Sequence, residues 1–297
     1  MDNNYKDQLY NLERTMKYLF MEIDHIKISQ GKILSELNKK KNSKNIQDYE
    51  FKIFSQWGED GIIQKIIDSI EIKNKTFIEF GVGNFLESNC RFLMMHNNWS
   101  GFVIDSSEKM IEMLKKAYFY WKYNLKSINA FIYKENINNL LLKSEFDFDL
   151  GLLSIDIDGN DYYILEAISQ YKPRILVVEY NSLFGSKRNI SIPYTPDFNR
   201  TKANSSNLYF GASLGAITYI AKKKGYILVG SNSSGVNAFY VRKDLMNKKL
   251  NEKSVKEAYT ISKLRESRDE SGKLSYLAAE KRLKAIKGTE VFNVINK

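Results

Sequence analysis

One stretch, KTFIEFGVGNFLESNCRFLMMHNNWSGFVID from Lys75 to Asp105, constrains the fold of this chain more than any other. Thr76 to Phe80 is a short β-branched and aromatic run, which predicts a buried strand. Gly81-Val82-Gly83 follows, and main chain without a Cβ can pass close to a ligand there. Leu86 to Met95 has helical spacing, and a second short strand, Gly101 to Ile104, ends on Asp105. This succession predicts the first strand–helix–strand unit of a parallel sheet.

The same unit is typical of the nucleotide-binding half of a Rossmann-like sheet. The carboxylate of Asp105, at the end of the second strand, would accept the hydroxyls of a ribose. The third glycine of the dinucleotide pattern is missing, with Leu86 nearest its place, and this argues against NAD or FAD. Glu79, just before the turn, suits a cofactor with a cationic amino-acid tail better than a diphosphate. An ordinary strand, turn and helix without a ligand is the alternative.

Several motifs resemble those of known methyltransferases. E-F-G-V-G at 79–83 with V-I-D at 103–105 resembles the first two motifs of class I S-adenosylmethionine-dependent methyltransferases. S-Q-W-G-E-D-G at 55–61 and G-V-N-A-F-Y-V-R at 235–242 resemble a bacterial family allied to the FkbM-type enzymes, over about residues 55 to 244. The resemblance implies S-adenosylmethionine as cofactor and an acceptor such as a sugar or sugar nucleotide in capsule or surface-polysaccharide biosynthesis. It also implies that Gln56 and Glu59 lie near the amino-acid end of the cofactor.

Further cofactor contacts are expected around the glycine turn. Ser88 and Asn89 would offer polar contacts at a helix N-terminus. Asn129 and Ala130 belong to a predicted third strand, Ser127 to Tyr133, where such a fold meets the adenine. The predicted cofactor-binding residues are Gln56, Glu79, Gly81, Gly83, Ser88, Asn89, Asp105, Asn129, Ala130 and Asp156.

Acidic residues follow two later apolar runs. Asp156 and Asp158 end the predicted strand Leu150 to Ile157, and Glu179 and Asn181 end the strand that begins at Arg174. The carboxyl ends of parallel strands meet at one edge of a sheet, and a spacing of two places each pair on one side of its strand. Three carboxylates and an amide oxygen suit Mg²⁺ or a related divalent ion, which would lower the pKa of a substrate hydroxyl.

We therefore predict that Asp156, Asp158, Glu179 and Asn181 are the catalytic residues and the metal ligands. The alternative has no metal: Asp156 contacts the cofactor and Glu179 binds the acceptor. His25 and His96, the two histidines of the chain, are both expected outside the active site.

The N-terminal region has a heptad pattern. Apolar residues recur at steps of four and three, with one polar interruption: Tyr5, Leu9, Leu12, Met16, Leu19, Ile23, Ile26, Gln30, Ile33 and Leu37. Such a seam predicts a coiled coil, so residues 5 to 37 are expected to form a homo-oligomer. The alternative is a helix that lies across the catalytic domain.

The remaining segments complete the predicted organisation. A loop from Ser182 to Leu208 is expected to cover the cleft, and its cations, Lys187, Arg188, Arg200 and Lys202, suggest an anionic small-molecule acceptor. A helix from Tyr209 to Lys224 and an antiparallel strand pair would close the sheet, and two helices, Ser254 to Ser267 and Lys273 to Ile286, would form a C-terminal extension. The predicted domains are 1–48, a coiled-coil helix and linker; 49–244, the methyltransferase domain; and 245–297, the helical extension.

Composition sets broad limits. The net charge is +10, most simply from solvated lysines, so no nucleic-acid partner is expected. A single cysteine, Cys90, is compatible with the cytoplasm, and no apolar run approaches the roughly 20 residues of a transmembrane helix. Two other functions stay open: a nicotinamide-dependent enzyme on the same sheet, and a coiled-coil scaffold with a degenerate α/β domain.

Overall fold

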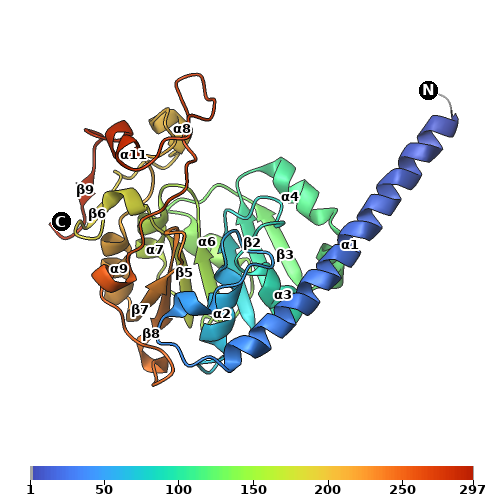
Figure 1. Cartoon of the computed structure of the whole chain (residues 1–297), viewed down its shortest axis with the longest axis horizontal. Coiled ribbons are helices and arrows are strands. Elements are labelled where there is room, and N and C mark those ends of the chain that lie inside the picture. The colour runs from blue at the N-terminus through green and yellow to red at the C-terminus, as the bar shows by residue number, and fades with distance from the viewer. Residues whose placement is uncertain (1–2, 297) are drawn as a thin grey trace.

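Seven strands form one sheet at the centre of the chain, in the order β3-β2-β1-β4-β5-β8-β7 (Figure 1). The description rests on a computed structural model and covers residues 3 to 296. The strands are β1 (Thr76–Phe80), β2 (Ser100–Asp105), β3 (Leu125–Asn129), β4 (Leu152–Ile155), β5 (Ile175–Glu179), β7 (Tyr226–Ser231) and β8 (Asn237–Arg242). Neighbours among β1 to β5 are parallel, while β8 is antiparallel to both β5 and β7. The predicted mostly parallel sheet with a final antiparallel hairpin is confirmed.

Helices cover both faces of this sheet, so the strands are apolar on both sides. Phe77 and Val103 point into a cluster shared with one set of helices: α2 (Glu59–Ile67), α3 (Arg91–Asn97), α4 (Glu108–Lys115) and α5 (Tyr118–Lys122). Ile78 and Ile104 point into the opposite cluster with α6 (Ile137–Leu142), α7 (Asp161–Ala167) and α9 (Leu214–Lys223). The alternation of side chains along each strand produces these two cores.

Several element ends differ from the predicted ones. β4 ends at Ile155, so Asp156 and Asp158 lie beyond the strand rather than on it. β3 lies two residues earlier at its start than predicted, and the helix predicted from Glu108 to Lys122 is broken into α4 and α5. Helix α3 begins at Arg91 rather than Leu86, because the carboxylate of Glu79 accepts the N–H groups of residues 89 and 90.

Helix α1 (Asn3–Lys39) crosses one side of the sheet domain and extends beyond it at its N-terminal end (Figure 1). Its C-terminal half packs through Asp24, Gly31 and Ser35, which are buried. A Cβ on Gly31 would lie 2.6 Å from the ring of Phe92, so the helix approaches α3 as closely as glycine allows. The heptad seam is not the face that packs on the domain. Its nine apolar members are 45% to 67% exposed.

A buried ion pair anchors α1. The guanidinium of Arg91 lies 2.5 Å from the carboxylate of Asp24, which also accepts a hydrogen bond from the hydroxyl of Tyr118. The same guanidinium lies between the rings of Phe54 and Phe119, 4.2 Å from each centroid. Burial alone lowers the pKa of Arg91, and Asp24 counters that effect. The pair therefore joins α1 to the first residue of α3.

The C-terminal region follows the surface of the domain and is mostly irregular. Its regular elements are short: η3 (Lys243–Leu245), α10 (Val255–Ala258), α11 (Glu280–Ala285) and β9 (Phe292–Asn293). The two long helices predicted there are wrong, because the segment lacks an apolar face that would support them. Strand β9 pairs with β6 (Ile190–Ser191), in the loop after β5 that also contains η2 (Ser182–Phe184) and α8 (Arg200–Ala203). No helix within residues 3–296 is both long enough and apolar enough to span a membrane.

Replacing Asp24 by alanine should destabilise the fold. The variant leaves the buried guanidinium of Arg91 without its counter-ion, and we expect the free energy of unfolding to fall by about 3 kcal/mol. Urea unfolding measures this change. Glu22→Ala is the control, because Glu22 belongs to an exposed pair with His25, and it should change stability by less than about 0.5 kcal/mol. Equal effects of the two substitutions would show that the Asp24 pair does not anchor α1.

Candidate functional site

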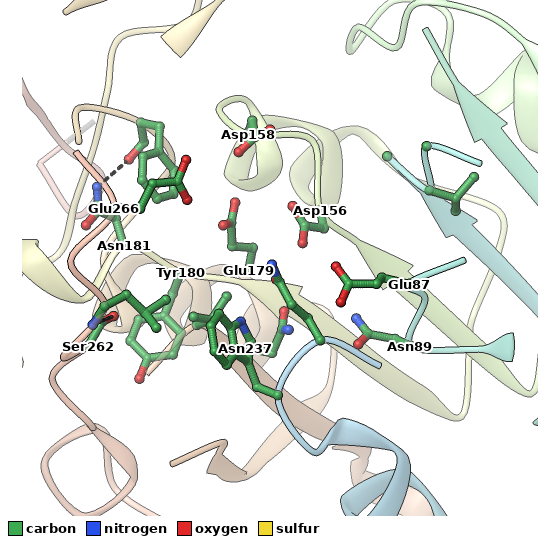
Figure 2. A pocket seen from close by; sticks show the side chains of 18 of the residues that line it. Glu87, Asn89, Asp156, Asp158, Glu179, Tyr180, Asn181, Asn237, Ser262 and Glu266 are labelled. Atoms are coloured by element: carbon green, nitrogen blue, oxygen red, sulfur yellow. Dashed lines mark hydrogen bonds between the residues drawn. The ribbon is translucent and has the colours of Figure 1, made fainter. Parts of the chain in front are cut away.

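A cavity of about 640 Å³ opens at the carboxyl ends of the central strands (Figure 2). Its wall includes the glycine turn after β1, the loop after β4 and the end of β5, together with Asn237 at the start of β8. Strands β1 and β4 adjoin each other although they are not consecutive, which is the topological switch point where open α/β sheets bind ligands. The glycine turn and the acidic residues predicted from the sequence thus line one cavity.

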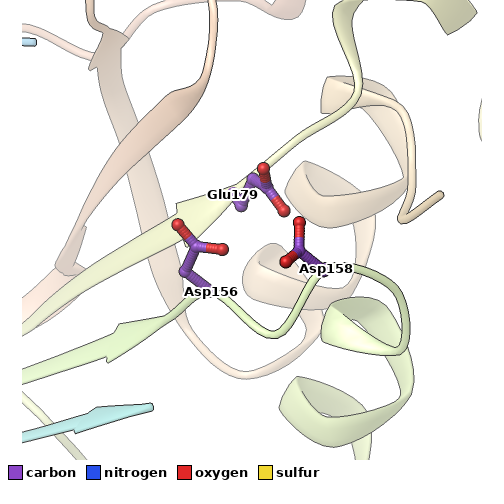
Figure 3. Close-up of side chains that lie close together, drawn as sticks. All are labelled: Asp156, Asp158 and Glu179. Atoms are coloured by element: carbon purple, nitrogen blue, oxygen red, sulfur yellow. The ribbon is translucent and has the colours of Figure 1, made fainter. Parts of the chain in front are cut away.

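Asp156, Asp158 and Glu179 converge on this cavity (Figure 3). One carboxylate oxygen of each lies within 4.8 Å of the others. Asp156 directly follows β4, and Asp158 has a left-handed backbone (φ 57°) in the turn that leads to α7. Glu179 is the last residue of β5. The three acids meet because β4 and β5 are parallel neighbours and because the turn brings Asp158 back, not because an extended strand carries both aspartates.

Mutual repulsion and burial perturb these acids. Burial, with Asp158 and Asp161 nearby, raises the pKa of Asp156 well above its usual range. Burial and the charges of Asp156 and Asp158 likewise raise the pKa of Glu179. Oε2 of Glu179 is buried without a hydrogen-bond partner. Such groups favour a proton, a cation or a hydrogen-bond donor in the cavity.

Two other residues shape the acidic group. Asp161 accepts the N–H groups of Ile157 and Gly159 and so fixes the turn that carries Asp158. Arg200, from α8, forms an ion pair with Asp158, and its guanidinium lies 4.6 Å from the ring centroid of Phe210. The expected loop thus reaches the cavity, although Lys187, Arg188 and Lys202 do not line it.

The two glycines of the turn differ in the space that surrounds a Cβ position. Both have positive φ, 68° for Gly81 and 53° for Gly83. A Cβ on Gly81 would lie 1.8 Å from the carbonyl oxygen of Asp156, so glycine is required there by the neighbouring backbone. A Cβ on Gly83 would meet nothing within 4 Å, and this position faces open space in the cavity. The N–H of Gly83 donates to Oδ2 of Asp105 at 2.7 Å, which ties the turn to the end of β2.

Glu79, Ser88 and Asn89 line the cavity but are bonded mainly to one another. Ser88 donates to Glu79 at 2.5 Å, and the main-chain N–H of Asn89 donates to it at 2.8 Å. The amide of Asn89 donates to Ser154. Burial raises the pKa of Glu79 to about 7. Their predicted contacts with a cofactor remain predictions, and the structure shows that they hold the loop before α3.

The other predicted cofactor residues lie at different distances from the cavity. Gln56 lines it and is exposed, next to Trp57. Asn129 is the last residue of β3 and Ala130 follows it; both donate to the carbonyl of Asp105, outside the cavity wall. Asp105 does not line the wall; it lies behind Gly83, whose N–H donates to its carboxylate.

Asn181 is not brought into the acidic group. Its amide N–H₂ donates to the carbonyls of Leu208 and Phe210, and its oxygen accepts the N–H of Leu183. The side chain therefore holds the segment before α9. Its oxygen has a second lone pair, so its predicted role as a ligand stays a prediction.

The sequence did not point to several residues of the wall. Ser262, Leu264, Glu266 and Arg282 come from the irregular C-terminal region. Their place depends on a long chain path without periodicity, so no local pattern signals it. Glu59 is fully buried, away from the cavity wall, and it bonds to Asn232 and Asn237. The motif around Glu59 is visible in the sequence, but its contacts lie more than 170 residues away along the chain.

Negative charge prevails in the wall. Six carboxylates and two guanidiniums line it: Glu79, Glu87, Asp156, Asp158, Glu179, Glu266, Arg200 and Arg282. One of the guanidiniums, Arg200, is paired with Asp158. The wall is therefore suited to a cation or to neutral donors, and the anionic acceptor stays a prediction.

Glu179→Gln should stabilise the protein at neutral pH and not at pH 4. The unfolded chain ionises Glu179 near pH 4, whereas the fold raises the pKa of this group. The folded state thus retains a proton that the unfolded state loses, and stability falls as pH rises through that window. Glutamine removes this cost, so the melting midpoint at pH 7.5 should rise by about 2–4 °C.

Melting curves in EDTA at pH 4 and pH 7.5 make the comparison. The matched control is Glu87→Gln, because Glu87 lines the same cavity in an exposed pair with Lys52. A midpoint that rises equally at both pH values, or for both variants, would contradict the assignment.

Comparisons with known proteins complete the description of the site. No protein-family model matches the sequence, and no curated protein matches it. Similar solved structures include an O-methyltransferase family protein from Burkholderia thailandensis, with 12% identity, a TM-score of 0.37, and coverage of 62% of this chain and 58% of that one. Another is an S-adenosylmethionine-dependent methyltransferase from Clostridium acetobutylicum (10%, 0.39, 62% and 90%). A third is PKMT2 from Rickettsia typhi in complex with AdoHcy (12%, 0.40, 65% and 53%). These matches are too distant to decide what this chain does.

Proposed function

We propose that this chain is an S-adenosylmethionine-dependent methyltransferase that moves a methyl group to an oxygen or nitrogen of a small acceptor. The observation that carries the proposal is the single cavity that contains both the glycine turn after β1 and the acids after β4 and β5. The bound donor supplies an electrophilic methyl carbon on a sulfonium sulfur. The proposal includes the acceptor that the sequence resemblance suggests, a sugar or sugar nucleotide of capsule or surface-polysaccharide biosynthesis in the cytoplasm.

The donor would bind at the glycine turn. Gly83 leaves room for it, since no atom lies within 4 Å of the position of a Cβ there. Asp105 holds this turn through the N–H of Gly83 and would accept a ribose hydroxyl with its remaining lone pairs. Gln56 and Trp57 also line the cavity and are exposed, and they would cover the bound donor. The residues present therefore fit the cofactor.

The acidic group would act on the acceptor. As the new bond to the methyl carbon forms, the bond from that carbon to the sulfonium sulfur would break, leaving S-adenosylhomocysteine. The acceptor would lose a proton, which the ionised form of Asp156 or Glu179 would take. Burial and mutual repulsion raise the pKa of both carboxyls, so each holds a transferred proton more tightly than an exposed carboxylate does. Much of the rate would come from holding the acceptor in line with the methyl group in a site that excludes water.

A divalent ion is one version of this proposal. Asp156, Asp158 and Glu179 offer the hard oxygen ligands that Mg²⁺ prefers, and the buried, unpartnered Oε2 of Glu179 suits a cation. The ion would stabilise the deprotonated acceptor oxygen. In the other version, Glu179 contacts the acceptor directly. Loss of activity in EDTA and its return with Mg²⁺ would select the first version.

Binding of S-adenosylhomocysteine tests the proposed cofactor. Calorimetry should detect S-adenosylhomocysteine and no NAD⁺. Gly83→Leu should weaken binding at least about tenfold, because the new side chain enters the cavity and displaces ligand contacts worth more than 1.4 kcal/mol. Gly225→Leu is the control for backbone strain, since Gly225 has a positive φ of 84°, an equally open Cβ position and a place outside the cavity.

Other outcomes would point to the rival functions. Binding of NAD⁺ would identify a nicotinamide-dependent enzyme. A well-folded protein that binds neither ligand would favour a scaffold in which α1 is the working part. Equal losses in the two leucine variants would assign the effect to strain and leave the turn without a shown role.

We also propose that α1 associates with a second copy of the chain. The seam points away from the domain, and all side chains from Tyr5 to Phe20 are exposed. A seam of apolar residues that repeats over more than four heptads is self-complementary, because each a or d residue can pack between four residues of an identical helix.

Leu12→Glu with Leu19→Glu should convert the oligomer to a monomer. Both positions lie on the seam, and charges there would have to be buried in the interface. Light scattering coupled to gel filtration measures the mass. Tyr10→Glu is the matched control, because Tyr10 is 66% exposed on the same helix but lies off the seam. A protein that is monomeric before any substitution would disprove the association.

A further inference from the structure

Asn237 has a buried oxygen without a partner. Its side chain is 3% exposed, lines the cavity and comes from the first residue of β8. The amide nitrogen donates to Oε1 of Glu59 at 3.0 Å, while Oδ1 has no hydrogen bond. A buried acceptor without a partner costs about 1–3 kcal/mol. Such an atom at the wall of a cavity indicates a place for a ligand.

Glu59 fixes which way this amide points. Its carboxylate is fully buried and accepts four hydrogen bonds, from the N–H groups of Trp57 and Gly58 and from the amides of Asn232 and Asn237. Four donors match the lone-pair sites of an ionised carboxylate, so Glu59 acts here only as an acceptor. A reversed amide at position 237 would set its oxygen 3.0 Å from a carboxylate oxygen, and the two would repel. The oxygen of Asn237 is thereby kept free.

A second unpartnered acceptor lies beside it. Glu179 and Asn237 are paired residues in the antiparallel ladder between β5 and β8, and Oε2 of Glu179 is also buried without a partner. Figure 2 shows both side chains on the wall of the cavity. In the sheet, β5 and β8 lie on the far side of β4 from β1 and its glycine turn. This pair therefore belongs to the acceptor end of the cavity.

We propose that Asn237, oriented by Glu59, is a specificity residue that accepts a hydrogen bond from an amine or hydroxyl of the methyl acceptor. A carboxylate or phosphate would meet only acceptor oxygens there and would be rejected. The proposal rests on the methyltransferase function and names the chemistry by which the acceptor is recognised. Any anionic part of the acceptor would then lie away from Asn237 and Glu179.

Matched pairs of small ligands test this proposal. We would measure binding of D-glucosamine against D-glucuronate, and of cyclohexylamine against cyclohexanecarboxylate, by ligand-observed NMR on the full chain saturated with S-adenosylhomocysteine. The wild type should prefer the amine of each pair at least tenfold. Asn237→Leu should lower the preference, because the acceptor oxygen is lost while the side-chain volume is similar and the carboxylates of the wall remain.

Glu59→Gln should change the preference between amines and carboxylates in a direction that a purely structural role of Glu59 does not predict. Its Oε1 would still accept from Trp57 and Gly58, so its N–H₂ would face the amides of Asn232 and Asn237. Asn232 would lose its bond, since its oxygen is held by the N–H groups of residues 236 and 237, and the amide of Asn237 would turn around. Asn237 can turn because its oxygen has no other bond. The cavity would then present a donor, and the ligand preference should reverse toward the carboxylates.

The outcomes separate the two proposals. Failure of the wild type to bind S-adenosylhomocysteine would remove the methyltransferase function itself. Normal binding of that ligand, with equal preference for amines and carboxylates or with no binding of either amine, would overturn the role of Asn237 alone. That role is equally disproved if Asn237→Leu keeps the amine preference at unchanged affinity for S-adenosylhomocysteine. If Glu59→Gln fails to fold, the Asn237→Leu comparison still decides.

Discussion

Carboxylates that are buried or half-buried hold several loops around the cavity by accepting main-chain N–H groups. Glu59 binds residues 57 and 58, Asp60 binds residues 53 to 55, and Glu79 binds residues 89 and 90. Asp161 and Asp105 do the same for the turns after β4 and β1. Loops have no ladder to satisfy their amides, and a buried acceptor with charge supplies strong bonds in its place. The wall of the cavity is therefore set by fixed negative charges.

Hydrogen bonds distinguish these carboxylates from the acidic group. At Asp60 and Glu79 they oppose the rise in pKa that burial causes, whereas Asp156 and Glu179 have no such support and repel each other. Acids thus occur in two settings: some hold loops through hydrogen bonds, and others, Asp156 and Glu179, lie in the cavity wall without such bonds, where we propose that they act on the acceptor. The number of hydrogen bonds that each carboxylate accepts distinguishes the two settings. Glu79 faces the cavity but accepts three, so it belongs with the carboxylates that hold loops.

The sequence predicted the sheet well because its information is local. Strands such as Thr76–Phe80 are apolar runs between turn residues, and the order of strands follows from parallel pairing. The meeting of Asp156, Asp158 and Glu179 followed from the same rule. The partners of Asn181 lie in a loop almost thirty residues away, and Glu59 and Asn237 are 178 residues apart, so no local pattern shows either set of bonds. The heptad seam was recognised, but residue spacing does not reveal which face of α1 lies on the domain.

The chain after β8 is more than an appendage. It places four side chains in the wall of the cavity, and its far end is fastened by the pairing of β9 with β6. A protein truncated after β8 would retain all seven strands of the sheet and lose one side of the cavity wall. Substitutions in the chain after β8 can therefore change which molecules the cavity admits without changing the strands of the sheet.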